Sequence, residues 1–158
     1  NFLKAKQNII INGKTGCGKS FLAQALGNRA IYEGFTVYYI RTSTLLEEIK
    51  LSRIDGTYTN LVKRFARYKL LILDDFGVSP ISVDDATNLF EIIEIRSQLS
   101  STIITSQLPV KDWYGYLQNN TVADAILDRV VHSSHRIEIE GDSLRAKYSN
   151  LNQKFEDN

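Results

Sequence analysis

The sequence predicts an α/β fold in which helices cover both faces of a five-stranded parallel sheet. One observation is that five short apolar segments alternate along the chain with segments of helical periodicity. The other is that the first apolar segment runs directly into residues 13–20, Gly-Lys-Thr-Gly-Cys-Gly-Lys-Ser. This octapeptide matches G-x-x-x-x-G-K-[ST], the phosphate-binding loop of P-loop proteins, with the required strand before it and helix after it. A P-loop α/β domain is therefore expected.

Each expected element follows from its local pattern. The expected strands are short apolar runs at residues 8–12, 35–40, 69–74, 102–106 and 135–140. The expected helices occupy residues 18–33, 43–52, 59–68, 84–97 and 122–131. For the first helix we expect a buried stripe of Phe21, Leu22, Ala25, Leu26 and Ala30. A short aromatic segment is expected to pack under the sheet edge through Trp113, Tyr114 and Tyr116.

The loop at residues 13–20 is expected to bind the phosphates of a nucleotide. Backbone N–H groups at the start of a helix form an anion cradle, and glycines leave room for the phosphate oxygens. Lys19 would reach the β- and γ-phosphates, and the Ser20 hydroxyl would ligate Mg²⁺. The alternative is a glycine-rich turn that happens to carry a lysine, which the flanking strand and helix disfavour. The predicted nucleotide-binding residues are Gly13, Lys14, Thr15, Gly16, Cys17, Gly18, Lys19, Ser20 and Phe21.

Composition narrows the class of protein. At 158 residues the chain fits one domain, with a core at residues 1–141 and a short polar tail at residues 142–158. The single cysteine excludes an internal disulfide. Since no stretch reaches the roughly 18 apolar residues of a membrane span, we expect a soluble, cytoplasmic protein without a membrane contact. The net charge is only +1, so binding to nucleic acid would require a local basic patch.

Two acids close the third expected strand. The apolar run at residues 70–73 ends in Asp74 and Asp75. In a P-loop protein the first acid holds Mg²⁺ and a second acid can polarise the attacking water. The alternative is a solvated acidic turn. Because the acids follow the third strand rather than the second, we expect the ATPase branch, in which another strand is inserted beside the strand of the loop, and water as the acceptor.

Two further polar residues are candidates for the reaction. Gln107 follows the fourth strand at the carboxyl edge, where open α/β folds bind ligands, and is a candidate to sense the γ-phosphate or orient water. An ordinary turn is the alternative. Arg129, on the helix before the last strand, is a candidate arginine finger for a neighbouring subunit. Spacing alone favours an ion pair with Asp128 or a glutamate instead.

Five segments together resemble the ATPase domain of the IstB-like transposition helper proteins. They are GKTGCGKS, FLAQALGNRA, LLILDDFG, STIITSQLPVKDW and ADAILDRVVHSSHRIEIEGDSLR, and the resemblance covers about residues 8–147. These helpers are AAA+ ATPases similar to the DnaC helicase loaders. The resemblance implies that the ligands are ATP and Mg²⁺ and that the partners are DNA and a transposase. It also implies that the protein associates with further copies of itself. It also implies Walker A roles for Lys19 and Ser20, a Walker B role for Asp74, a sensor I role for Gln107 and an arginine-finger role for Arg129.

The sequence departs from the AAA+ pattern in two places. Asp75 stands where most AAA+ ATPases have glutamate, and its shorter reach implies slow hydrolysis. The tail after Gly141 is too short for the usual helical lid, which leaves a sensor II role for Arg145 open. In the family, a partner-binding domain and part of the adenine pocket would precede Asn1, so we expect that domain to be absent from this chain.

A basic stretch favours DNA as a partner. Residues 61–69 contain no acid, and the predicted DNA contacts are Lys63, Arg64, Arg67 and Lys69. The alternative is a solvated helix whose apolar back faces the core through Leu61, Val62, Phe65 and Tyr68. His132 and His135 lack a third ligand nearby, so structural roles are favoured over metal binding.

The expected function is that of an ATPase domain which binds ATP and Mg²⁺, assembles on duplex DNA and assists a transposase. One alternative is a DnaC-like replicative helicase loader, with the same chemistry and a different client. A second is a nucleotide-gated DNA-binding module that hydrolyses ATP very slowly. A third is a small-molecule kinase, against which stand the second acid, Asp75, and the lack of an arginine-rich lid.

Overall fold

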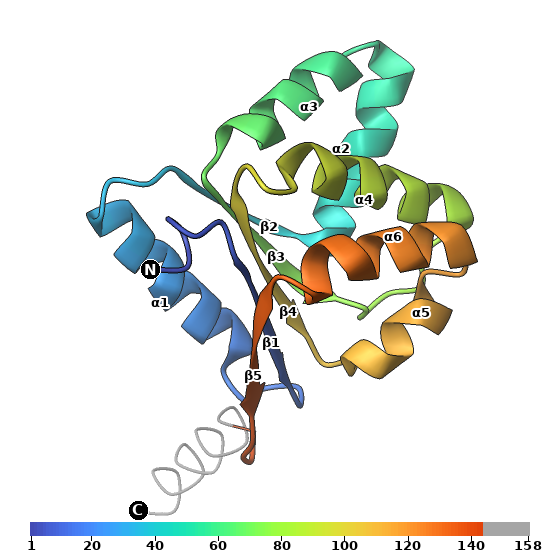
Figure 1. Ribbon diagram of the computed structural model, residues 1–158. Coiled ribbons are helices and arrows are strands. Elements are labelled where there is room, and N and C mark those ends of the chain that lie inside the picture. Colours follow the sequence, from blue (N-terminus) through green and yellow to red (C-terminus); the bar gives the residue numbers. More distant parts are fainter. Residues whose placement is uncertain (144–158) are drawn as a thin grey trace, which may run out of the picture.

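The structure is a computed structural model that describes residues 1–143. Its centre is one parallel sheet in the order β2-β3-β4-β1-β5 (Figure 1). The strands are β1 (Asn8–Gly13), β2 (Val37–Arg41), β3 (Leu70–Phe76), β4 (Ser101–Ser106) and β5 (Ser134–Ile139). All five expected strands are confirmed, and β4 is the expected inserted strand between β1 and β3.

Helices connect the strands. They are α1 (Lys19–Tyr32), α2 (Thr42–Asp55), α3 (Tyr58–Arg67), α4 (Val83–Arg96), α5 (Trp113–Tyr116) and α6 (Asn120–Val131), with a 3₁₀ turn, η1 (Val110–Asp112), before α5. The sequence predicted all of these helices except η1 and α5. Those two are too short, at three and four residues, to show a helical period.

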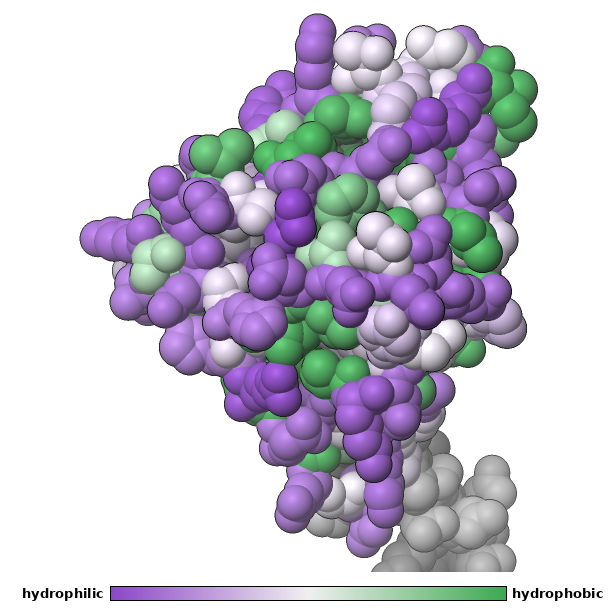
Figure 2. Space-filling view, turned by 45° about the vertical axis from the view of Figure 1, so that its right-hand side comes forward, coloured by the Kyte–Doolittle hydropathy of each residue, from purple (hydrophilic) through white to green (hydrophobic). Residues whose placement is uncertain are grey.

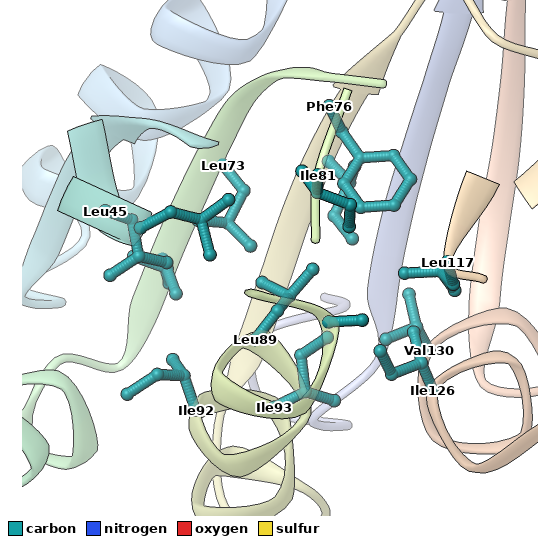
Figure 3. Close-up of a cluster of buried hydrophobic side chains, with 14 of the residues drawn as sticks. Leu45, Leu73, Phe76, Ile81, Leu89, Ile92, Ile93, Leu117, Ile126 and Val130 are labelled. Carbon is teal, nitrogen blue, oxygen red and sulfur yellow. The ribbon is translucent and has the colours of Figure 1, made fainter. Parts of the chain in front are cut away.

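The two faces of the sheet are covered unequally. Helix α1 lies on one face, while α2, α3, α4 and α6 lie on the other (Figure 1). Alternate residues of the same strand therefore enter different cores, as Ile72 packs toward α1 and Leu73 toward the helices opposite. Figure 3 shows the larger core, to which β3 contributes Leu73, α4 contributes Leu89 and Ile93, and α6 contributes Ile126.

The expected buried stripe of α1 is partly wrong. Phe21 is 79% exposed, and Ala25 is also exposed. Ala30 is buried as expected, and Leu22 and Leu26 are partly buried against the same core. The helix also buries Ala23 and Gly27, which were not predicted. A Cβ on Gly27 would lie 2.8 Å from Cδ1 of Ile72, so the helix approaches the sheet too closely there for a larger side chain.

A buried arginine closes the amino edge of the sheet. Arg96, at the end of α4, is 2% exposed, and burial lowers its pKa to about 10. Its guanidinium donates to the carbonyls of Phe65, Tyr68 and Ser101 at 2.6, 2.8 and 2.7 Å, and to the Thr102 hydroxyl at 3.4 Å. It therefore joins the end of α3 to the starts of β3 and β4.

The surface is mixed in character. Figure 2 shows a face on which polar residues predominate and apolar residues form small separate groups. No helix in the part of the chain described is long and apolar enough to cross a membrane.

Candidate nucleotide-binding site

The predicted site residues meet at the carboxyl edge of the sheet. There, a hollow of about 550 Å³ is lined by the phosphate loop, the ends of β2 and β3, and the residue after β4. Its lining residues are Thr15, Gly16, Gly18, Lys19, Ser20, Phe21, Arg41, Asp75, Val78 and Gln107. Parallel strands bring their carboxyl ends to the same edge, which is why residues up to 92 positions apart converge.

The backbone of the loop requires its glycines. Gly16 and Gly18 have φ angles of 81° and 97°, a left-handed conformation that other residues adopt only under strain. At Gly13 a Cβ would lie 2.6 Å from the Cys17 sulfur and 2.7 Å from the Ile139 carbonyl oxygen. The loop is thus closely packed against the end of β5 and leads straight into the N-terminus of α1, where partial positive charge favours an anion.

Lys19 is buried without a counter-charge. Its side chain is at the first position of α1 and the residue is 9% exposed. Nζ donates to the Lys14 carbonyl at 2.8 Å and lies 4.0 Å from the Cys17 sulfur. Among the described residues no carboxylate pairs with it. An ammonium group held by a carbonyl beside an anion cradle matches the predicted phosphate contact.

Asp74 ends in a nest of hydroxyl groups. The residue is 2% exposed, and its two carboxylate oxygens lie 2.8 and 2.9 Å from the Ser20 hydroxyl. The Thr105 hydroxyl donates to Oδ1, and the Tyr39 hydroxyl donates to Oδ2. Within residues 1–143 no cation pairs with this carboxylate, and a buried charge of this kind is costly unless it is compensated. Carboxylate and hydroxyl oxygens are ligands that Mg²⁺ prefers, so Ser20 and Asp74 fit the predicted metal site.

Asp75 differs from its neighbour. Its φ is 57°, and this turn directs the side chain away from the sheet and toward the hollow, where its side chain is 45% exposed. Its N–H donates to the Thr105 hydroxyl at 3.0 Å, so Thr105 contacts both acids. The carboxylate lies 3.9 Å from Nε of Arg41. Asp75 therefore lines the hollow beside the phosphate loop, and its role in polarising water stays a prediction.

Gln107 lines the same hollow as Asp75 and contacts the loop. Its side-chain oxygen accepts a hydrogen bond from the Thr15 hydroxyl. In the described part of the chain its amide nitrogen has no hydrogen-bond partner, which leaves that donor for a ligand. Its predicted role in sensing the γ-phosphate or orienting water stays a prediction.

Arg129 lies elsewhere. It pairs with Glu94 of α4, and its guanidinium lies 5.2 Å from the centre of the Phe90 ring. It lines a second hollow, of about 330 Å³, at the amino edge of the sheet together with Lys6 and Arg96. Arg129 therefore does not reach the nucleotide hollow of its own chain, and the ion pair favoured by spacing is present, although the partner is Glu94 rather than Asp128.

The basic residues between β2 and β3 fall into two groups. One group is paired with acids: Lys50 with Asp85, Arg53 with Glu91, and Arg64 with Glu48. The other comprises Lys63, Arg67 and Lys69, which are exposed and have no ion pair among the described residues. The apolar back of α3 is confirmed in the core at Leu61 and Phe65. Of the predicted DNA contacts, Arg64 alone is already neutralised.

Sequence reasoning missed the contributions of β2. The register that pairs Arg41 with Asp74 places Tyr39 and Arg41 beside the acids. Partial burial raises the pKa of the Tyr39 hydroxyl, and its hydrogen bond to Asp74 raises it further. Nothing in the sequence of β2 shows which strand adjoins it, so only the alternation of Tyr38 and Tyr39 between the two faces was available as a signal.

The remaining predictions have mixed outcomes. Trp113 is fully buried against Phe76, and Tyr116 also packs on Phe76, whereas Tyr114 is 40% exposed. No group of three potential metal-ligating His, Cys, Asp or Glu side chains occurs in the described range. Arg145 lies outside the described residues.

Comparison with known proteins decides the family. A protein-family model described as "IstB-like ATP binding protein" matches residues 1–152. This chain belongs to that family. A putative insertion sequence ATP-binding protein of Sinorhizobium fredii is 46% identical over 92% of this chain and 59% of its own length. The insertion sequence IS232 putative ATP-binding protein of Bacillus thuringiensis is 36% identical over 92% of this chain and 58% of its own length. The chain thus spans about three fifths of these IstB-like relatives.

Solved structures show the fold of this IstB-like chain. The DnaC helicase loader has a TM-score of 0.72 and 22% identity, covering 88% of this chain and 84% of that one. AMPPCP-bound DnaA from Aquifex aeolicus has a TM-score of 0.73 and 22% identity, covering 99% and 48%. The predicted α/β P-loop fold of the AAA+ type is confirmed.

Proposed function

We propose that this chain is the ATPase domain of an insertion-sequence helper protein, which binds ATP with Mg²⁺, assembles on DNA and assists a transposase. The observation that carries the proposal is the contact of Ser20 with the buried carboxylate of Asp74, which has no cation partner among the described residues and lies beside the phosphate loop. Family membership supports ATP as the nucleotide, and the printed names of the relatives support the insertion-sequence setting.

The residues of the hollow divide the chemistry between them. The loop N–H groups and Lys19 would bind the phosphates, and Ser20 with Asp74 would hold Mg²⁺. The ion, when bound, supplies positive charge that neutralises the phosphate oxygens. Asp75 and Gln107 line the same hollow, where Asp75 would accept a proton from the attacking water and Gln107 would orient that water.

Assembly would complete the site. Arg129 does not line the nucleotide hollow of its own chain, so an arginine-finger role requires a neighbouring subunit. It also requires Arg129 to break its ion pair with Glu94. Such a finger is worth about 10³ or more in rate where it operates. Dependence on a neighbour would link hydrolysis to assembly on DNA.

DNA would bind through the unpaired cations at the end of α3. Lys63, Arg67 and Lys69 are exposed and have no acid beside them among the described residues. Flexible exposed cations neutralise phosphates without reading base sequence, so the binding would depend strongly on salt and weakly on sequence.

The second candidate is a nucleotide-gated DNA-binding module with very slow hydrolysis. The specific observation in its favour is Asp75, whose side chain is short, starts from a left-handed backbone and lies 3.9 Å from Arg41. The helicase-loader alternative has less support, since its structural likeness at 22% identity bears on the fold alone while the insertion-sequence relatives reach 46%.

The test is sedimentation of the purified protein with long duplex DNA in the presence of ATP and Mg²⁺, ADP, or no nucleotide. We expect co-assembly with ATP only, and phosphate release that rises with assembly. Arg129→Ala should retain ATP binding and lose assembly-dependent hydrolysis. Arg136→Ala is the matched control, because Arg136 is an exposed arginine of the adjacent strand β5. ATP-dependent assembly with no phosphate release would favour the gated module, and absence of assembly in every nucleotide state would contradict both.

A further inference from the structure

Strand β2 contributes one hydroxyl group to the metal-binding acid. Tyr39 donates from its hydroxyl to Oδ2 of Asp74, although the two residues are 35 positions apart. Tyr39 is 38% exposed, so its ring is not a core residue whose hydroxyl must find whatever partner is at hand. Its hydroxyl instead donates to the carboxylate of Asp74, a residue that is 2% exposed. This contact lies in the nucleotide site but is not part of the phosphate-loop pattern.

The three hydroxyl groups around Asp74 have different tasks. Ser20 lines the hollow, and its oxygen can ligate Mg²⁺ while its hydrogen still points to the carboxylate. Thr105 and Tyr39 do not line the hollow. They contact one carboxylate oxygen each, Thr105 at Oδ1 and Tyr39 at Oδ2. Together they restrict rotation of the carboxylate about its terminal bond, which is otherwise soft.

The end of β2 is held to Asp74 a second time. Thr42, the first residue of α2, donates from its hydroxyl to the Asp74 carbonyl at 3.0 Å. The main chain of the acid is therefore fixed by Thr42 and its side chain by Tyr39, both from the same strand end. Groups that orient a metal ligand in this way commonly change metal affinity by about 10–100-fold when they are removed.

We propose that Tyr39 is a positioning residue, whose hydroxyl fixes the carboxylate of Asp74 in the orientation that binds the Mg²⁺ of bound ATP. The inference rests on the proposed ATP site and adds to it a residue from the edge strand. It predicts that Tyr39 acts on the metal and not on the nucleotide, since the hydroxyl touches Asp74 and lies outside the lining of the hollow.

Tyr39→Phe removes only the hydroxyl, and the neighbouring Tyr38→Phe is its matched control. Tyr38 is on the same strand but faces the opposite side of the sheet, where its ring packs on Phe65 and Tyr68. The measurement is binding of a fluorescent ATP analogue during a Mg²⁺ titration, repeated in EDTA, with thermal melting of each apo protein. For Tyr39→Phe we expect the half-saturating Mg²⁺ concentration to rise about tenfold while affinity in EDTA stays the same. Tyr38→Phe should leave both unchanged.

A second variant separates the hydrogen bond from ring packing. Tyr39→His keeps a ring with an N–H donor and should restore part of the Mg²⁺ affinity. The inference is overturned if Tyr39→Phe leaves the Mg²⁺ midpoint in place, or if it weakens binding equally in EDTA. Failure of the unsubstituted protein to bind the analogue at all would overturn the proposed function as well, so the two failures are distinguishable.

Discussion

The sheet buries one cation at each of its edges, and the two are used differently. At the amino edge, the Arg96 guanidinium donates to four acceptors of the protein itself. At the carboxyl edge, the Lys19 ammonium donates to one carbonyl, that of Lys14, and lines an open hollow. Neither has an ion-pair partner among the described residues. Both edges therefore bury a charged side chain. They differ in that the N–H groups of Arg96 are directed at the protein, whereas Lys19 has N–H groups that can be directed at the hollow.

The comparison shows how a structural cation is distinguished from a functional one. Arg96 donates to three main-chain carbonyls and one hydroxyl of the protein itself, so its charge serves the fold. Lys19 has N–H groups left over, and a buried donor without a partner is costly. A phosphate would supply that partner. Substitution should accordingly reduce stability at one edge and ligand binding at the other.

The largest expected effect is on stability at the amino edge. Arg96→Ala leaves the Phe65, Tyr68 and Ser101 carbonyls without their donor, and each buried unsatisfied group costs about 1–3 kcal/mol. We expect the free energy of unfolding to fall by about 3–5 kcal/mol. Urea unfolding followed by circular dichroism measures it.

The control for that change is Arg29→Ala. Arg29 is an exposed arginine that pairs with Glu33 on the same helix, and such surface pairs contribute about 0–1 kcal/mol. Arg96→Lys should recover only part of the loss, because an ammonium cannot reproduce the planar donor geometry. If Arg96→Ala and Arg29→Ala are equally stable, Arg96 does not have the structural role assigned to it at the amino edge.

At the carboxyl edge the expected effect is on binding. Lys19→Ala should lower the affinity for ATP at least about a hundredfold, because a charge-assisted contact to phosphate in a sheltered site is lost. The free energy of unfolding should change little, since Lys19 satisfies only one carbonyl. Isothermal titration calorimetry gives the affinity. Lys111→Ala is the matched control, because Lys111 is an exposed lysine of η1 that does not line the hollow. If Lys19→Ala is strongly destabilised but binds ATP normally, Lys19 is a structural cation and not a ligand-binding one.

The smallest effects per residue belong to the exposed cations of α3 and of the segment between α3 and β3. Each of Lys63, Arg67 and Lys69, changed to alanine, should weaken DNA binding modestly and reduce the slope of log affinity against log salt by about 0.9. The triple variant should lose about three times that slope, because separate exposed charges act nearly independently. Arg64→Ala, which removes a cation already paired with Glu48, should change the slope less. Fluorescence anisotropy with labelled duplex at several salt concentrations measures the slopes, and an Arg64 effect as large as the others would contradict the grouping.

Much of the fold could be predicted because its signals are local. The apolar runs, the helical periods and the glycines at positions 16 and 18 depend on near neighbours in sequence, and the structure has the strands and longer helices where they were expected. The buried face of α1 could not be predicted in this way. It is set by the distance between Gly27 and Ile72, which belongs to the packing of the helix on the sheet.

The phosphate loop and the acid pair could be identified from the sequence, because each is a run of neighbouring residues. The family could be identified as well, because several such runs occur together. Tertiary structure decided which acid is buried, since the hydroxyl groups around Asp74 come from α1, β2 and β4. It also decided which cations are paired, because Lys50, Arg53 and Arg64 each pair with an acid on another helix. Side-chain partners depend on the order and register of strands and on how helices pack, and these are long-range properties that no local pattern specifies.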